Sequence, residues 1–250
     1  MSENTDINYP YSYSPQRETA GRTHNIIAEV RSAIAPYRFT VAAKGIVDEL
    51  GISQESNVLE LGSGLGLLGN AIKKNVGTPL KYIGLDLVFN SVKESEKKGL
   101  LSIQTEITHL PLEDRSFDFI VTTDVLEHVP NAESVVSEIS RVLKPGGKGF
   151  IVIADPSEAG FENVTGHINR SNESTDIRYW ERLFVKKGLN VSPNSTKYRG
   201  KDWRRIFNLP LFTKLKNRPG FACAFNPINR PGVYIIQKPV VLDTQGAMVI

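Results

Sequence analysis

The sequence predicts an α/β fold in which helices cover both faces of a doubly wound, mostly parallel sheet of seven strands. From residue 57 onwards, short apolar runs alternate with helix-like patterns. The first run ends in a turn of three closely spaced glycines, and the second ends in an aspartate. Because parallel sheets bind ligands beyond the carboxyl ends of their strands, we expect a ligand at these glycines.

The spacing of the apolar residues predicts each element in order. Between residues 25 and 50 they recur mostly every three or four positions, which indicates a helix interrupted near Pro36. Strands are predicted at residues 58–61, 81–85, 101–104, 117–122, 149–154, 189–192 and 232–237. Helices are predicted at residues 67–75, 88–98, 132–143 and 175–187. Gly99 and Gly188 end two of these helices, and the KPGG stretch at 144–147 closes a third.

Composition favours a soluble protein of a reducing compartment. Apolar residues make up 40% and charged residues 23% of the chain, which is ordinary for a globular protein. No apolar run approaches the ~20 residues needed to cross a bilayer, and the N-terminal residues lack a basic, apolar leader. The single cysteine, Cys223, cannot form an internal disulfide. We therefore expect a cytoplasmic protein.

The net charge of +3 is too small to indicate nucleic-acid binding by itself, but it is unevenly distributed. The stretch from residue 197 to residue 218 contains eight basic residues and one acidic residue, Asp202. This local excess could contact a phosphate, an acidic substrate or an anionic membrane surface, or it could be a solvated loop.

The glycine turn has the features of a nucleotide-binding loop. Gly62, Gly64 and Gly66 allow a sharp turn and bring backbone N–H groups against a ligand, at the start of the following helix. Asp86 ends the next strand, where a carboxylate can accept hydrogen bonds from ribose hydroxyls. The spacing G-S-G-L-G differs from the G-x-G-x-x-G pattern of dinucleotide-binding folds.

A series of motifs along the chain resembles those of the class I S-adenosylmethionine-dependent methyltransferases and follows the same order as in that family. "VLELGSGLG" resembles their first motif and "GLDL" their second, followed by "EITHLPLEDRSFDFIV", "VLEHVPN", "EISRVLKPGG" and "FIVIADP". The resemblance covers residues 57–156 and extends weakly to "WERLFVKKGLNV" and "GVYIIQKP". It is nearest to the small-molecule enzymes related to ubiquinone-biosynthesis O-methyltransferases.

The resemblance implies a Rossmann-like fold whose last strand is antiparallel. It implies a methyltransferase domain at residues 51–240, after an N-terminal lid or helical segment at 1–50 and before a tail at 241–250. The segment at 200–231 would be an insert that caps the substrate. With the loop at 156–174 and the N-terminal segment, it would form a lid over the strand ends.

The resemblance also implies a binding site for S-adenosylmethionine. The glycines would line its methionine and ribose, Asp86 would bind the ribose hydroxyls, and Leu87 would lie against the adenine. Glu106 replaces the family's usual aspartate at the adenine amino group, and Glu60 would face the cationic end. The full set of expected cofactor-binding residues is Glu60, Gly62, Ser63, Gly64, Gly66, Asp86, Leu87, Glu106, Ile107, Thr123 and Asp124.

Two histidines are candidates for the general base that a hydroxyl acceptor needs. His128 follows the fourth strand, with Glu127 beside it to orient the ring. His167 lies on the loop after the fifth strand. The alternative for His128 is packing or capping of the next helix, and for His167 a hydrogen bond to backbone. Asp124, Glu127 and His128 could also hold a divalent metal, but we favour a site without metal.

The favoured function is methyl transfer from S-adenosylmethionine to a small-molecule hydroxyl, by in-line attack on the methyl group. The alternatives are N- or C-methylation of a small metabolite, methylation of a nucleic acid, and a cofactor-binding scaffold subunit without activity. Nucleic-acid and membrane-surface partners are not favoured. The sequence specifies neither the acceptor nor the oligomeric state.

Overall fold

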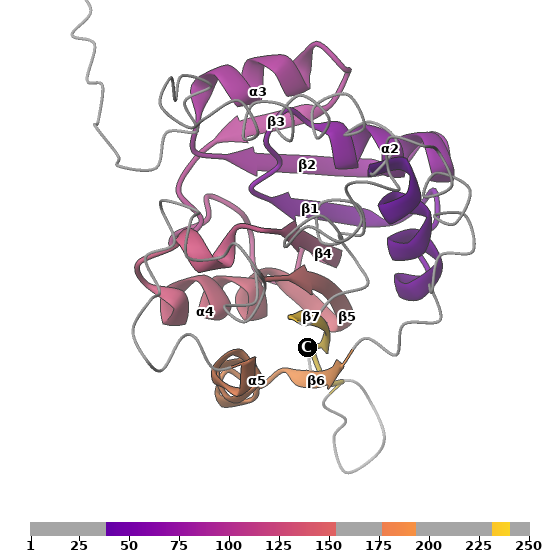
Figure 1. Cartoon of the computed structure of the whole chain (residues 1–250). Helices are drawn as coiled ribbons and strands as arrows, with labels where there is room; N and C mark the ends of the chain where they lie inside the picture. The colour runs from indigo at the N-terminus through magenta and orange to yellow at the C-terminus, as the bar shows by residue number, and fades with distance from the viewer. Residues whose placement is uncertain (1–38, 154–176, 194–231, 241–250) are drawn as a thin grey trace, which may run out of the picture.

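A computed structural model describes residues 39–153, 177–193 and 232–240, which contain a single seven-stranded sheet (Figure 1). The strand order is β3-β2-β1-β4-β5-β7-β6. The strands are β1 (Asn57–Leu61), β2 (Lys81–Asp86), β3 (Leu101–Gln104), β4 (Phe117–Thr123), β5 (Leu143–Val152), β6 (Asn190–Pro193) and β7 (Val233–Gln237). His167, the loop at 156–174, the insert at 200–231 and the basic cluster at 197–218 lie outside the described residues.

The sheet has the predicted direction of strands. The first five strands pair in parallel. The last strand, β7, lies between β5 and β6 and is antiparallel to both. The doubly wound sheet with one antiparallel strand is therefore confirmed. The order reverses at β1, since β2 and β4 pair on its two sides, and this is where the rule for parallel sheets expects a ligand.

Helices lie on both faces of the sheet, with α2 on one side and α4 on the other in Figure 1. The helices are α2 (Leu67–Val76), α3 (Phe89–Glu96), α4 (Ala132–Val142) and α5 (Ile177–Lys186), a helix at residues 39–50, and a 3₁₀ turn, η1 (Leu126–His128). None of these helices is long and apolar enough to span a bilayer.

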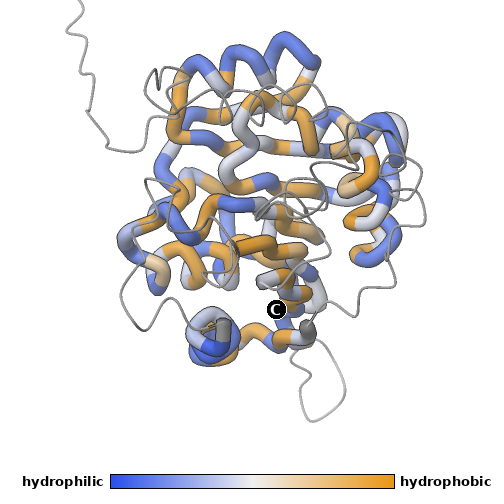
Figure 2. The backbone as a smooth tube through the Cα atoms, viewed as in Figure 1, coloured by the Kyte–Doolittle hydropathy of each residue, from blue (hydrophilic) through white to orange (hydrophobic). Residues whose placement is uncertain are grey.

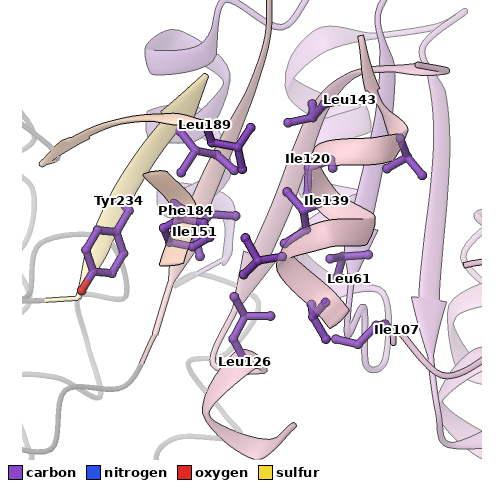
Figure 3. Close-up of a cluster of buried hydrophobic side chains, with 14 of the residues drawn as sticks. Leu61, Ile107, Ile120, Leu126, Ile139, Leu143, Ile151, Phe184, Leu189 and Tyr234 are labelled. Carbon is purple, nitrogen blue, oxygen red and sulfur yellow. The ribbon is translucent and has the colours of Figure 1, made fainter. Parts of the chain in front are cut away.

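The side chains of β1 alternate between two apolar clusters, one on each face. Leu59 and Leu61 belong to the cluster that includes α4 and α5, whereas Val58 belongs to the cluster with α2 and the helix at 39–50. Figure 3 shows the first cluster, in which Ile139 of α4 lies close to the sheet residue Ile120. In Figure 2 the strands are largely hydrophobic, and α3 has hydrophilic outer turns.

The described part of the predicted N-terminal lid belongs to the core. In the helix at residues 39–50, Ala42, Ala43, Ile46 and Leu50 are all at most 2% exposed and pack with α2. Their three- and four-residue spacing buries one stripe of this helix against the sheet. The domain boundaries at 50 and 240 stay predictions, as does the role of residues 1–38.

The KPGG stretch differs from the prediction, because it begins a strand instead of ending a helix. Helix α4 ends at Val142 and β5 starts at Leu143, so the stretch lies inside β5. The pairing with β4 shifts register between Phe117 and Phe119, which accommodates a proline and a left-handed glycine, Gly146. The irregularity explains why the pattern alone predicted a strand only from residue 149.

Aromatic side chains of helix α5 pack against the C-terminal strand β7, and a substitution in α5 tests how much this packing stabilises the fold. Phe184 is fully buried, and its ring centroid lies 6.4 Å from that of Trp180 and 5.8 Å from that of Tyr234. We expect Phe184→Ala to lower the free energy of unfolding by about 3–5 kcal/mol. The neighbouring change Val185→Ala, at a side chain 62% exposed, should cost less than about 0.5 kcal/mol. Urea denaturation measures both, and equal losses would contradict the packing.

Candidate functional site

The turn between β1 and α2 contains three glycines with left-handed backbone, at φ 68°, 51° and 70° for Gly62, Gly64 and Gly66. Side chains disfavour this conformation. A Cβ on Gly62 would overlap the side chain of Val125, and one on Gly66 would overlap Ser95 and lie 2.7 Å from Leu100 Cδ1. Among the described residues, a Cβ on Gly64 would meet nothing within 4 Å. Two of the glycines therefore permit close packing, whereas Gly64 presents bare backbone to open space.

Asp86 ties the glycine turn to the end of β2. Its Oδ2 accepts a hydrogen bond from the backbone N–H of Gly64 at 2.7 Å, and its Oδ1 accepts one from Val88 N–H at 2.9 Å. The backbone N–H of Ser63 also donates to the carbonyl of Leu85, at 2.8 Å. Each carboxylate oxygen has two lone pairs, so Asp86 keeps acceptor capacity for ligand hydroxyls.

Apolar side chains around Asp86 are unusually exposed. Leu65, Leu87, Val88 and Phe89 are between 37% and 54% exposed, although all four are large and hydrophobic. They belong to the glycine turn and to the segment that follows β2. Exposed apolar residues next to hydrogen-bonding groups suit a ligand with a flat apolar part and a polar part.

The segment between β3 and β4 continues the site beyond β2. Thr105 N–H donates to the carbonyl of Asp86 at 3.0 Å. Glu106 is exposed, with its Oε2 3.4 Å from the hydroxyl of Thr108, whereas the neighbouring Ile107 is in the core. The longer Glu106 side chain thus lies at the surface beside the strand end, where the resemblance expects an adenine contact.

Arg141 of α4 anchors the rest of this segment. Its guanidinium donates to the carbonyls of Leu110 and Leu112 at 3.0 and 2.7 Å, and forms ion pairs with Asp114 and Glu138. Glu138 in turn accepts from the backbone N–H of Leu110 at 2.6 Å. This pairing raises the pKa of Arg141 and lowers that of Glu138. The segment is therefore fixed to α4 through both its backbone and its side chains.

The end of β4 forms the other wall of the glycine turn. Asp124 has a left-handed backbone, at φ 58°, and its N–H donates to the carbonyl of Val152 at 2.9 Å. Among non-glycine residues, aspartate and asparagine adopt this conformation most readily, and such backbone clusters at functional sites. The following residue, Val125, fills the space above Gly62. The chain therefore turns back towards the glycines just after Thr123.

His128 lies in the 3₁₀ turn η1, which the sequence did not predict. It is half-buried, and its backbone N–H donates to the carbonyl of Val125 at 2.9 Å. Glu127 is 4% exposed. Among the described residues, no three acidic, histidine or cysteine side chains are grouped to hold a metal ion, so Asp124, Glu127 and His128 do not form such a group.

Glu60 lies in a buried polar layer behind the glycine turn. It is 3% exposed and accepts hydrogen bonds from the Tyr82 hydroxyl, at its Oε2, and from the backbone N–H of Gly69 in α2. Burial raises its pKa from 4.5 to about 8, and the nearby charge of Asp86 acts in the same direction. Burial and Glu60 also raise the pKa of Tyr82. Glu60 is therefore largely protonated at neutral pH.

The buried polar layer runs across three strands and consists of Glu60, Ser63, Tyr82, Ser95 and Ser102. Glu60, Gly84 and Ser102 are register partners on β1, β2 and β3. A Cβ on Gly84 would lie 2.8 Å from Ser63 Oγ and 3.1 Å from the Tyr82 hydroxyl, so only glycine leaves room for them. Ser63 Oγ is buried and, within the described residues, has no hydrogen-bond partner. A glycine inside a strand, in "YIGLD", is the sequence signal for this layer.

The structure thus joins several of the predicted cofactor residues directly. Gly64 donates a hydrogen bond to Asp86, and Leu87 follows Asp86 in the chain. Thr123 and Asp124 directly precede Val125, whose side chain packs against Gly62. Glu60 lies behind the turn instead of at the open face of Gly64. The roles assigned to these residues stay predictions.

Part of the chain matches a known protein family. A family model described as a methyltransferase domain matches residues 59–151. This match, together with the relatives described below, supports a class I S-adenosylmethionine-dependent methyltransferase domain over these residues. The matched residues include β1 with its glycine turn, Asp86, and the strands up to β5. The resemblance of the motif series is therefore confirmed.

Curated relatives of this chain are matched over part of their length. The chain is 39% identical over 105 residues to sterol 24-C-methyltransferase of Pneumocystis carinii, covering 39% of this chain and 27% of the relative. It is 29% identical over 158 residues to demethylmenaquinone methyltransferase of Oceanobacillus iheyensis, covering 57% and 66%. The chain thus spans less than two thirds of these relatives.

Solved structures share the methyltransferase fold. A Haloferax volcanii methyltransferase, solved in complex with the Trm112 methyltransferase activator, matches with a TM-score of 0.59 and 16% identity, covering 88% of this chain and 99% of that one. Phosphoethanolamine N-methyltransferase 2 of Haemonchus contortus matches with a TM-score of 0.57 and 17% identity, covering 84% and 57%. These similarities confirm the Rossmann-like fold.

The buried Glu60 should give stability a distinct pH dependence. The unfolded chain loses this proton near pH 4.5 and the folded chain near pH 8, so the folded state binds more protons between these values. Stability should therefore fall as pH rises through this window, by up to about 1.4 kcal/mol per pH unit. Glu60→Gln keeps the shape without the titration, and its advantage over the wild type should grow from pH 5 to pH 8.

Urea denaturation at pH 5, 6.5 and 8 measures this difference. Glu55→Gln is the matched control, because Glu55 is exposed and this substitution also removes one carboxylate. Its stability should follow the wild type at all three values. A Glu60→Gln curve parallel to that of the wild type would contradict the assignment of a raised pKa.

Proposed function

We propose that this chain binds S-adenosylmethionine across the carboxyl ends of β1 and β2 and transfers its methyl group to a small molecule. The observation that carries the proposal is the glycine turn, whose bare backbone at Gly64 faces open space while Asp86 holds it. Together with the family, this arrangement supports binding of an adenosyl group by its sugar, with backbone close against the methionine.

The described residues fit each part of this ligand. Asp86 has acceptor capacity left for the two ribose hydroxyls, and exposed Leu87 and Val88 offer an apolar surface to adenine. Glu106 can accept a hydrogen bond from the adenine amino group. Ser63 has a buried hydroxyl without a partner in the described part of the chain. Thr123 and Asp124 would close the site at the end of β4.

The chain's own contribution to the reaction is alignment and proton removal. When bound, S-adenosylmethionine supplies an activated methyl group on a cationic sulfur, so no metal is needed in principle. The site has to hold the acceptor atom in line with that methyl. We propose that His128 takes the proton of a hydroxyl acceptor and that Glu127 orients its ring. His167, outside the described residues, is the second candidate.

The favoured acceptor atom is oxygen, because the motif series resembles the ubiquinone-biosynthesis O-methyltransferases. Carbon is the second candidate, since one relative with 39% identity is named a sterol 24-C-methyltransferase. The proposed location is the cytoplasm. The segments at 156–174 and 200–231 stay the proposed cap over the acceptor.

Paired glycine variants test the binding site. Gly64 and Gly51 both have left-handed backbone, at φ 51° and 77°, and a Cβ on either meets nothing within 4 Å in the part of the chain that the structure describes. Changing each to alanine should cost about 1–2 kcal/mol of stability from backbone strain. Only Gly64→Ala should also weaken S-adenosylmethionine binding, by about tenfold or more, because its methyl group enters the ligand space.

Isothermal titration calorimetry with S-adenosylmethionine and with NAD measures this binding. We expect the wild type and Gly51→Ala to bind S-adenosylmethionine alike and NAD not at all. Binding of NAD alone would overturn the proposed function. Equal binding by both variants would place the ligand away from the glycine turn.

The role of His128 requires an acceptor, which a panel of quinols, sterols and amines would supply with isotope-labelled methyl donor. With a hydroxyl acceptor, His128→Asn should keep donor binding and slow methyl transfer by about 10²–10⁴-fold. His109→Asn is the control, because His109 is exposed. Unchanged transfer in His128→Asn would remove this residue as the base. A labelled C–CH₃ product would favour the second candidate.

A further inference from the structure

Glu60 is a buried acid that has no basic partner within residues 39–153, 177–193 and 232–240. No Lys, Arg or His among the described residues forms an ion pair with it, and its hydrogen bonds come from two neutral donors, Tyr82 and the backbone of Gly69. Buried acids are normally paired or neutral. Here the acid lies two residues before Gly62, about 7 Å along the strand. A cation bound over the glycine turn would supply the missing charge.

We infer that Glu60 makes the site selective for the cationic methyl donor over its neutral-sulfur product, by giving up its proton when the donor binds. This inference rests on the proposed function, which puts a sulfonium at the turn. The O–H bond of the Glu60 carboxyl breaks, the carboxylate keeps the electron pair, and the proton passes to the solvent. After methyl transfer the sulfur is neutral, and the carboxylate takes up a proton again.

The surroundings of Glu60 favour this exchange. From α2, the N–H of Gly69 points to the carboxyl from the first turn of the helix, where partial positive charge favours an anion. From β2, the Tyr82 hydroxyl donates to it and also favours the ionised form. Asp86, at the end of β2, opposes ionisation by its charge. The register partner on β4, Val121, is apolar.

Burial keeps the proton on Glu60 when no cation is near. It opposes ionisation more than the two donors favour it, which places the pKa of Glu60 at about 8. A positive charge in this poorly solvated region acts strongly, because water screens it little. S-adenosylmethionine carries that charge at its sulfur and S-adenosylhomocysteine does not, while the rest of the two molecules is the same except for the methyl group.

Calorimetry of the full chain in buffers with different ionisation enthalpies counts the protons released on binding. At pH 7 the wild type should release up to about one proton more with S-adenosylmethionine than with S-adenosylhomocysteine. Glu60→Gln should remove this difference, because glutamine does not titrate. Protonation of the ligands' own amino groups is the same in both proteins and cancels in the comparison. Glu55→Gln should behave as the wild type.

The ratio of the two affinities gives a second measurement. In the wild type, preference for the donor should rise with pH from 6 to 8, by up to about tenfold per pH unit, and then level off. Glu60→Gln should show a low, flat preference. Tyr82→Phe, which removes one donor to the carboxylate, should weaken donor binding several-fold more than product binding.

The outcomes separate this inference from the proposed function. A wild type that shows no larger difference in proton release between the two ligands than Glu60→Gln does overturns the inference. A proton difference that persists in Glu60→Gln assigns it to another group and also overturns it. Absence of binding by either ligand overturns the proposed function itself. A difference present in the wild type and lost in Glu60→Gln supports the inference.

Discussion

The hydrogen bond from the Gly64 backbone to the Asp86 carboxylate joins the two strands on which the site is built. Without it, Gly64 itself would have few constraints, since a Cβ there meets none of the described residues and glycine restricts its own backbone little. The bond fixes which way the bare backbone faces. It also leaves Asp86 oriented, with acceptor capacity for a ligand, before any ligand arrives.

The sheet behind this bond has two different surfaces. The face against α4 and α5 is an apolar cluster, in which aromatic residues of α5 pack on the last strands. On the other face, the buried polar layer lies directly behind the glycine turn. An apolar layer would stabilise the fold more simply, because each buried polar group has to recover its lost hydration.

Much of the fold could be predicted because each element buries residues at its own period. Alternation in β1 and the three- and four-residue spacing in α2 and α4 gave strands, helices and their order. Two features could not be predicted. The KPGG stretch matches a helix end locally, yet pairing with β4 extends it as a strand. The turn η1 depends on how Val125 packs on Gly62, which is a contact between distant residues.

The site could be predicted only in part, because some of its residues come together only through the pairing of strands. Glycines and Asp86 could be found because their spacing is local, whereas Tyr82, Gly84 and Ser102 matter only through the register of neighbouring strands. The orientation of Glu60 follows from the same register. The family resemblance implied that Glu60 faces the cationic end of the cofactor, and only the packing of Tyr82 and Gly69 shows that it lies behind the turn.

The anchoring of the β3–β4 segment by Arg141 has a consequence for how such a protein changes over generations. The guanidinium and Glu138 hold this segment through contacts among the described residues, so the proposed nucleotide side has an anchor of its own, apart from the segments proposed to cap the acceptor. On the proposed function, mutations in those capping segments would alter the choice of acceptor while the residues proposed to bind adenosine keep their arrangement. New acceptor specificities would then arise without loss of the proposed methyl donor.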